Sequence, residues 1–348
     1  MNRDFTPTYY SIKRNIKDQI ARNILQPGEL LPGRKAMCEL YDCSWSTLNR
    51  AVNELILEGV LTAEKGKGTY VSSRPQPGAA GGEQPKTLNV WLCNPYPSVY
   101  GMISEMMDGM REEAHQRGVS IRFLDLVDSA IPKELDEYIV VTPSNEQLVS
   151  LIEAYEYGSR FVVVNSSWQG APYPCIDADI FGAVSEATSL LLHKGHRNIG
   201  LLGIRSGLSN YERRVDAFRG AFLQGGLPLS DEWIVGRPEN REEAKKLYGE
   251  WLDRHSEVTA LFAADYATTL ILLELLAEKN IKVPQQISLF TVGAPRFASL
   301  QNTPISTIVQ PFYEMGRLSV VRLLERQMTG GTELLACKLL MGDSVSTV

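Results

Sequence analysis

One face of the segment Ser44–Glu58 carries side chains that can read base pairs. If the segment is a helix, polar and aromatic residues recur on this face at steps of about four residues. Its members are Trp45, Ser46, Asn49, Arg50 and Asn53. Asn can hydrogen-bond both N6 and N7 of adenine, and Arg can bind guanine or a phosphate. These residue types on an exposed face predict contact with the edges of base pairs.

The opposite face of the same segment is apolar. It carries Leu48, Ala51, Val52, Leu55 and Ile56, which follow the i, i+3, i+4, i+7, i+8 pattern of an amphipathic helix. A shorter helix is predicted over Arg34–Leu40, and the tight turn Tyr41–Cys43 joins the two. Two helices joined in this way are typical of a helix-turn-helix, whose second helix enters the major groove of DNA.

A hairpin and a supporting helix complete this small domain. Two short strands, Leu61–Glu64 and Thr69–Val71, flank the tip Lys65-Gly66-Lys67-Gly68. Two cations and two glycines at a tip can lie against phosphates or a minor groove. A helix over Tyr9–Leu25 is predicted to cover the core, with Ile12, Ile16, Ile20 and Ile24 on one face.

Together the segment Tyr10–Val71 resembles the winged helix-turn-helix of the GntR family of bacterial transcription regulators. The matching stretches are Pro27–Pro32, Ser44–Leu48, Leu55–Leu61 and Gly66–Val71. The resemblance implies a DNA-binding domain over residues 1–73. Its expected contacts to DNA are Lys35, Ser44, Trp45, Ser46, Thr47, Asn49, Arg50, Lys65, Gly66 and Lys67.

The departures from the family pattern concern the choice of operator sequence. Lys35, Trp45 and Asn49 stand where the family usually has Arg contacts to DNA, and Gly33-Arg34 replaces its usual Ser-Glu. We therefore expect winged-helix binding to a different operator. For Trp45 two roles stay open: contact with a thymine methyl or deoxyribose, or packing within the domain.

Length, charge and cysteine usage set the class of protein. The chain has 348 residues, 44% of them hydrophobic, which is enough for two or more domains. No apolar run approaches the roughly 18 residues of a membrane span, and Met1–Asp4 does not begin a signal peptide. Five Cys without a CxxC pair indicate reduced thiols, so we expect a cytoplasmic protein.

The charge is unevenly divided along the chain. The whole sequence has a net charge of −6, but residues 1–74 carry 11 Lys and Arg against 8 Asp and Glu. The remainder therefore holds 24 against 33. A basic N-terminal domain on an acidic body favours DNA binding through that domain alone.

From Thr87 onward, short apolar runs alternate with predicted helices. A Pro- and Gly-rich linker over 74–86 precedes this part. The alternation predicts an α/β fold with parallel sheets covered on both faces. The length favours a two-lobed doubly wound domain over 87–348 rather than one large sheet. The expected lobes are 87–177 with 309–327, and 178–308 with 328–348.

This second part resembles the LacI/GalR effector domain, which is similar in fold to periplasmic-binding proteins. The matching stretches are Leu190–Gly200, Tyr211–Arg219, Leu261–Ala267 and Thr307–Pro311. The resemblance implies a sugar-like effector held between two lobes. A GntR-type domain joined to a LacI-type domain is also the architecture of the arabinose repressors of bacilli.

Several polar residues are expected at the effector site because strand ends converge there. Arg214 matches the family Arg that reaches ligand hydroxyls, and its neighbour Arg213 is expected to face solvent. Asp265 matches the family's acidic residue that accepts hydrogen bonds from a sugar. It can equally cap the N-terminus of the following helix. Asn165 follows a strand and either contacts the ligand or opens a turn. Asp177 matches a position between the lobes, or holds a turn.

Aromatic residues and one further cation complete the expected effector site. Asn94 begins a loop after the first strand that also holds Tyr96 and Tyr100, and Trp168 follows the fourth strand. Each aromatic ring either stacks on a pyranose or packs in the core. Arg296 lies where the family usually has an acid. It favours an anionic sugar such as a uronate, unless its side chain points away.

Enzyme and metal chemistry find no support in the sequence. His193 and His196 have no third ligand nearby, and Gly203–Gly207 lacks the Lys-Ser/Thr of a phosphate loop. We expect no catalytic residue, cofactor or metal. A sugar-binding transport receptor would need a secretory signal and no DNA-binding domain. A fusion to a pyridoxal-phosphate enzyme would need a larger second domain and a Schiff-base Lys.

The sequence thus predicts a transcription regulator, with repression as the expected mode. Its expected partners are double-stranded operator DNA and a small-molecule effector, a sugar or sugar acid. A homodimer is expected, because two-fold operators match two-fold proteins, and no membrane partner is expected.

Overall fold

The computed structural model describes most of the chain. The described residues are 8–22, 24–41, 43–57, 60–64, 68–72, 86–93, 100–125, 137–156, 158–293, 304–327 and 329–348. The chain divides into two compact units, Met1–Gln84 and Pro85–Val348. Within the described ranges, no helix has the length and apolar character needed to cross a membrane. The predicted linker falls almost entirely outside the described residues.

The first unit has three helices and a hairpin among its described residues. They are α1 (Thr8–Ala21), α2 (Arg34–Leu40), α3 (Trp45–Leu57), β1 (Leu61–Glu64) and β2 (Gly68–Val71). β1 and β2 are antiparallel, with Leu61 opposite Val71. The apolar stripe predicted for α3 is buried: Leu48, Ala51, Val52 and Leu55 are fully covered. The helix-turn-helix and the strands of the wing are therefore formed as predicted.

The predicted first helix was too long. Ile12 and Ile16 are buried as expected, but α1 ends at Ala21, and Ile24 is 62% exposed. The backbone N–H of Ile24 and that of Leu25 both donate to the carbonyl oxygen of Gln19, at 2.8 and 3.2 Å. These bonds replace the i→i−4 pattern, so the chain turns away before it reaches Pro27.

The first sheet of the second unit is entirely parallel. Its strands are β3 (Thr87–Leu92), β4 (Ser120–Asp125), β5 (Tyr138–Val141), β6 (Phe161–Val164), β7 (Pro174–Ala178) and β13 (Gly331–Leu335), in the order β13-β7-β6-β5-β3-β4. The helices α4 (Tyr100–Gln116) and α10 (Phe312–Leu324) cover one face, and α5 (Asn145–Glu156) covers the other. Burial on both faces explains the continuous apolar runs of these strands.

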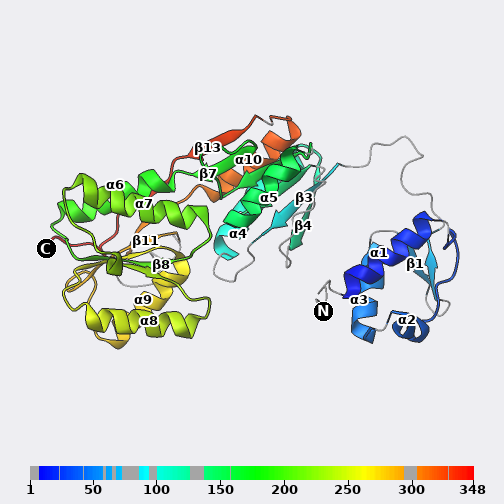
Figure 1. Cartoon of the computed structure of the whole chain (residues 1–348), viewed down its shortest axis with the longest axis horizontal. Helices are drawn as coiled ribbons and strands as arrows, with labels where there is room; N and C mark the ends of the chain where they lie inside the picture. The colour runs from blue at the N-terminus through cyan, green and yellow to red at the C-terminus, as the bar shows by residue number, and fades with distance from the viewer. Residues whose placement is uncertain are drawn as a thin grey trace. The chain divides into compact units, whose positions relative to one another are not determined.

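Two glycines allow α4 and α10 to lie against each other. A Cβ added to Gly109 of α4 would overlap the carbonyl oxygen of Tyr313, and one added to Gly316 of α10 would overlap that of Met106. The two helix backbones therefore approach more closely than side chains would permit. They form one layer in Figure 1, although α10 comes late in the chain.

The second sheet is parallel except at one edge. Its strands are β8 (Ile199–Ile204), β9 (Ile234–Gly236), β10 (Ala260–Ala263), β11 (Ser288–Val292), β12 (Ser306–Val309) and β14 (Lys338–Leu340), in the order β14-β12-β11-β10-β8-β9. Only β14 is antiparallel to its neighbour. The helices α6 (Ile180–His193) and α7 (Ser209–Gln224) cover one face, and α8 (Arg241–Arg254) and α9 (Tyr266–Glu278) cover the other (Figure 1).

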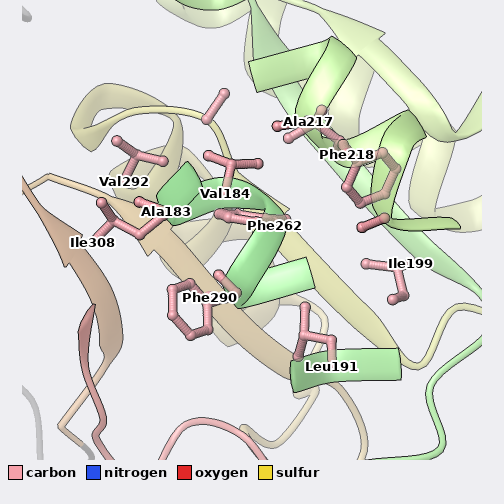
Figure 2. Packing of buried hydrophobic residues seen from close by; sticks show 14 of the residues in the cluster. Ala183, Val184, Leu191, Ile199, Ala217, Phe218, Phe262, Phe290, Val292 and Ile308 are labelled. Atoms are coloured by element: carbon pink, nitrogen blue, oxygen red, sulfur yellow. The ribbon is translucent and has the colours of Figure 1, made fainter. Parts of the chain in front are cut away.

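The core under α6 and α7 is built from aromatic and aliphatic side chains. Phe262 and Phe290 pack with ring centroids 5.3 Å apart, and Phe218 of α7 packs against the same cluster (Figure 2). Alternate residues of the central strands point to the opposite face, where Leu261 packs under α8 and α9. The two-lobed doubly wound architecture predicted from the sequence is therefore confirmed.

The chain crosses between the lobes three times in the described part. It passes from β7 to α6, from β12 to α10, and from β13 to β14. One predicted lobe boundary needs correction, because residues 331–335 were assigned to the second lobe. Instead, Gly331–Leu335 pairs in parallel with Pro174–Ala178 and extends the first sheet. The hydrogen-bonding edge of β7 thus determines where this segment lies.

Candidate functional site

The first turn of α3 displays the residues expected to contact DNA. Trp45 is 58% exposed, Ser44 immediately before it is also exposed, and so is Lys35 on α2. The hydroxyl of Ser44 accepts from the backbone N–H of Thr47 at 3.2 Å and lies 2.7 Å from its hydroxyl. Ser44 thus satisfies a free backbone donor at the start of the helix. This cap fixes the helix end at which Trp45 projects.

Arg34 also belongs to this surface, although it is not among the DNA contacts predicted from the sequence. Its Nε donates to Oδ1 of Asn49 at 3.0 Å, and its Nη2 donates to Oγ1 of Thr69 at 3.4 Å. Arg34 therefore joins α2, α3 and β2, and it orients the side-chain amide of Asn49. The signal in the sequence was the departure of Gly33-Arg34 from the family pattern.

Some expected contacts fall outside the described residues. Those of the first unit are Lys65, Gly66 and Lys67, together with the side chains of Ser46 and Arg50. Those of the second unit are Asn94, Tyr96 and Arg296, together with the side chain of Tyr100. Their roles stay predictions.

Polar residues from both lobes meet at the carboxyl ends of the parallel strands. Asn165 follows β6, Arg237 follows β9, and Asp265 lies just beyond β10. The helix α7 follows β8 and brings Tyr211 and Arg214 to the same region. Ligands of doubly wound folds bind at this end of the sheet, so this group is the candidate effector site.

Asp265 has several hydrogen-bond partners. Its Oδ1 accepts from the backbone N–H of Thr268 at 2.8 Å, which caps α9. Its Oδ2 accepts from the hydroxyl of Tyr211 at 2.6 Å and lies 3.5 Å from Nη1 of Arg237. The capping role expected as an alternative is therefore present. Burial raises the pKa of Tyr211, so the phenol stays protonated and donates a hydrogen bond to Asp265.

Arg214 lies deep in the same site. It is 4% exposed, and its Cζ lies 4.3 Å from the centroid of the Tyr211 ring. Its Nε and Nη1 are buried and have no hydrogen-bond partner within the described part of the chain. A buried donor without a partner is costly, and native structures contain few. Arg214 therefore has two unused hydrogen-bond donors at the candidate site.

The expectation that Arg213 faces solvent was wrong. Its Nη1 lies 3.3 Å from Oδ2 of Asp177, and its Nη2 donates to the carbonyl oxygen of Ser167 at 2.9 Å. The hydroxyl of Ser167 also donates to Asp177, at 2.7 Å. Adjacent residues of α7 are both covered because this helix end lies against the first lobe. Burial raises the pKa of Asp177, while Ser167 and Arg213 act in the opposite direction.

The two remaining expected effector contacts with described side chains have structural partners. Asn165 is fully buried with φ of 62°, and its Nδ2 donates to Oγ1 of Thr142 at 3.0 Å. Its carbonyl oxygen accepts from Nδ2 of Asn210 at 3.4 Å. Trp168 is half-buried and packs against the cluster that contains Tyr173. Asn165 therefore lies in a turn, and Trp168 packs against the core, as the alternatives for these two residues had it.

Metal ligation has no basis in the part of the chain that the structure describes. No group of three or more His, Cys, Asp or Glu there is placed to hold an ion. The buried histidine His196 instead bonds Thr259 and the carbonyl oxygen of Ser346.

Two family models match this chain. Residues 8–71 match the bacterial regulatory proteins of the gntR family, and residues 188–345 match the periplasmic binding protein-like domain. The chain therefore carries a GntR-type helix-turn-helix followed by a periplasmic-binding-protein-like domain, as the sequence analysis expected.

Curated relatives cover either the whole chain or its second part. The chain is 24% identical over 337 residues to the arabinose metabolism transcriptional repressor of Geobacillus stearothermophilus, covering 92% of this chain and 91% of that protein. It is 25% identical over 236 residues to the transcriptional repressor CytR of Escherichia coli K12, covering 66% and 68%. Both relatives are transcription regulators.

Solved structures share the fold. A transcriptional regulator CelR–cellobiose complex superposes with a TM-score of 0.64 at 17% identity, covering 90% of this chain and 100% of that chain. A LacI family regulator from Enterococcus faecium with bound ribose gives 0.63 at 20% identity, covering 76% and 100%. At these identities the likeness establishes the fold alone.

Proposed function

We propose that this protein is a sequence-specific DNA-binding transcription regulator, a repressor, whose affinity for operator DNA changes when a sugar-like effector binds. One observation carries the proposal. A single chain joins a winged helix-turn-helix with an exposed Trp45 to a two-lobed domain in which Nε and Nη1 of the buried Arg214 have no hydrogen-bond partner among the described residues.

The DNA-binding part is proposed to span residues 1–73. Its helix α3 enters the major groove with Trp45 and Asn49 toward the bases, and Lys35 contacts the backbone. Arg34 supports this role by holding the amide oxygen of Asn49. The wing tip, Lys65–Lys67, is proposed to contact phosphates of the DNA backbone.

The effector part is proposed to span residues 87–348, joined by a linker over 74–86. Arg214 and Asp265 are the proposed central contacts, and Asp177 with Arg213 sets the position of one lobe against the other. Of the proteins named above, one is a repressor of arabinose metabolism, one is complexed with cellobiose and one with ribose. A polyhydroxylated effector is therefore the class we propose for this chain.

The protein is proposed to work as a cytoplasmic homodimer. A two-fold dimer presents two copies of α3 to a two-fold operator, which multiplies their modest individual affinities. The relatives are regulators rather than enzymes, which supports a binding function without catalysis.

The test starts from DNA selected in vitro from a random pool by the full-length chain. We expect enrichment of a two-fold motif, bound in a salt-dependent manner. A panel of sugars and sugar acids is then added to the complex, and fluorescence anisotropy follows release of the DNA. Failure to enrich any motif would contradict the DNA-binding role. A motif whose binding responds only to substitutions outside α3 would contradict the contact assignment.

A further inference from the structure

We propose that Arg34 and Asn49 together read one guanine in the major groove of the operator. The inference rests on the proposed function and deepens it, because it names a base and the pair of side chains that selects it. It follows from the hydrogen bonds that hold the Arg34 guanidinium between α2, α3 and β2.

Two neutral acceptors hold the guanidinium of Arg34 in place. Its Nε donates to Oδ1 of Asn49 at 3.0 Å, and its Nη2 donates to Oγ1 of Thr69 at 3.4 Å. An arginine side chain has many rotamers, and the freedom among them is lost when it is immobilised. Arg34 gives up much of this freedom within the folded domain, which lowers the entropic cost of a contact with DNA.

Arg34 keeps its positive charge available for DNA. Burial lowers its pKa and Cys38 acts in the opposite direction, but a guanidinium stays protonated in proteins. Among the described side chains Arg34 has no carboxylate partner, because its two hydrogen bonds go to an amide and a hydroxyl. A fixed orientation is thus combined with a charge that no described acid neutralises, which favours a contact with nucleic acid.

The same hydrogen bond determines what Asn49 presents to DNA. An arginine nitrogen can only donate, so the amide oxygen of Asn49 must face Arg34, and its Nδ2 turns away with two N–H donors. Arg34 has five N–H donors and uses two of them in the bonds to Asn49 and Thr69. Three donors remain, two on Nη1 and one on Nη2. The pair therefore faces DNA mainly with hydrogen-bond donors.

Guanine is the base that matches such a pair. Its major-groove edge carries two neighbouring acceptors, N7 and O6, which a guanidinium binds through two hydrogen bonds. Adenine and cytosine each place an amino donor on this edge, and thymine places a methyl group beside its acceptor. A donor-rich pair held next to the groove-facing side of α3 therefore favours a G·C base pair.

Arg34 and Asn49 are also two positions at which the chain departs from the GntR pattern. Gly33-Arg34 replaces the usual Ser-Glu, and Asn49 stands where the family usually has an Arg contact to DNA. The chain thus keeps one cation at this contact but carries it on α2 instead of α3. The two departures touch each other and complement each other, because the amide of Asn49 accepts from the cation of Arg34.

The Arg34→Gln variant separates base readout from support of Asn49. Nε2 of Gln lies at the same bond position as Nε of Arg, so it can still donate to Asn49, but Nη1 and Nη2 are gone. Fluorescence anisotropy compares binding of the full-length protein to the selected DNA and to each single-base variant of it. We expect wild type to prefer guanine at one G·C pair by on the order of tenfold to a hundredfold, and Arg34→Gln to lose this preference.

Two further variants and a control complete the experiment. Arg34→Ala and Asn49→Ala should weaken the preference at the same base pair. Their double variant should lose less than the product of the two single losses, because the residues act as one unit. Arg22→Gln is the matched control, since Arg22 is exposed directly after the end of α1. It should keep the guanine preference of wild type. Thermal unfolding identifies any variant that does not fold, and Arg34→Gln carries the test if Arg34→Ala fails to fold.

Three results would overturn the inference. A guanine preference that survives Arg34→Gln would reduce Arg34 to a support of Asn49. An equal loss of affinity for all sequences would assign Arg34 to a phosphate. A selected motif in which no G·C pair depends on Arg34 would contradict the base assignment alone. Failure to enrich any motif is a different result, because it contradicts the proposed regulator itself.

Discussion

Arg213 and Asp177 pair across the two lobes: Nη1 of Arg213, on α7, lies 3.3 Å from Oδ2 of Asp177, on β7. Two neighbouring contacts also join the lobes. The backbone N–H of Asn145 donates to the carbonyl oxygen of Gly207 at 2.9 Å, and its Nδ2 donates to Glu212 at 2.7 Å. Closure of the lobes on this side is therefore maintained by hydrogen bonds that an opening motion would have to break.

Replacing Arg213 by Ala should destabilise the protein. The change removes the cation from a carboxylate that is 1% exposed, so we expect a loss of about 1–3 kcal/mol in the free energy of unfolding. Urea denaturation measures the loss. Arg219→Ala, on the exposed side of α7, should change stability by less than about 0.5 kcal/mol. Equal losses in the two variants would mean that the pair with Asp177 adds no stability.

Two substitutions of Asp265 should separate its capping role from its ligand role. Asp265→Ala removes the cap of α9 and should lower stability by about 0.5–2 kcal/mol. Asp265→Asn keeps a capping oxygen and should retain most of that stability. Both should weaken effector binding by roughly tenfold, because both remove the carboxylate held by Tyr211. Calorimetric titration is the measurement, and unchanged affinity in Asp265→Asn would remove Asp265 from the site.

Trp45 is predicted to act on DNA rather than on folding. Because its side chain is largely exposed, Trp45→Ala should leave Tm nearly unchanged. Affinity for the selected DNA should fall, because an aromatic contact to the groove is lost. Thermal unfolding and anisotropy titration are compared on the same preparation. A lowered Tm with unchanged DNA affinity would assign Trp45 to packing instead.

Asn49 should contribute to sequence preference. Asn49→Ala is expected to relax the preference at one base pair, at a cost on the order of 1–3 kcal/mol for the selected sequence. Lys67→Ala is the comparison. It should weaken binding to all DNA sequences alike, and it should reduce the slope of log binding constant against log salt concentration by about one. Binding to the selected DNA and to single-base variants is measured at several salt concentrations. A uniform loss across these sequences in Asn49→Ala would argue against base readout.

His196 should make stability fall in mild acid. The ring is 1% exposed, and burial lowers its pKa, so the folded protein holds it neutral. An unfolded His takes up its proton near pH 6.5. Between that pH and the lower folded pKa the unfolded state binds more protons, so the free energy of unfolding decreases as pH falls. Above about pH 7 this effect is absent.

Urea denaturation at pH 5 and pH 8 measures this dependence. His196→Gln should show a smaller stability difference between the two pH values than wild type, because the other titrating groups are unchanged. Equal differences in the two proteins would show that His196 does not contribute. The same measurement reports on the contact between His196 and the segment around Ser346, because Nε2 of His196 lies 3.1 Å from the carbonyl oxygen of Ser346.

The amphipathic helices and the strands with continuous apolar runs could be predicted from the sequence, and the strands β13 and β14 could not. The sequence pattern predicts helices over Ile180–His193 and Arg241–Arg254, and these are the bounds of α6 and α8 in the structure. β13 and β14 were missed, because both strands are only partly buried and carry no continuous apolar run. Their strand state depends on partners far away in the chain, such as β7 for β13.

The candidate site was predicted where a family resemblance supplied the position, and for Asn165 where a predicted strand ends. Arg214 and Asp265 were found in this way, and the structure brings both to the region of Tyr211. Arg237 was missed, because nothing in its local sequence shows that β9 ends beside Asp265. Arg213 was misjudged because the usual rule for adjacent helix residues assumes that one side faces water. Here the second side faces another lobe.

The late position of α10 and β13 in the sequence has a consequence for protein synthesis. A ribosome completes β3 to β7 before it reaches the second lobe, yet Phe312, Met315, Val320 and Leu323 of α10 cover one face of that first sheet. The apolar residues that α10 covers, such as Val162 of β6 and Ile176 of β7, therefore stay uncovered by it until nearly the whole chain has been translated. Nascent chains that stop before residue 312 present this surface to one another, which makes them prone to aggregate.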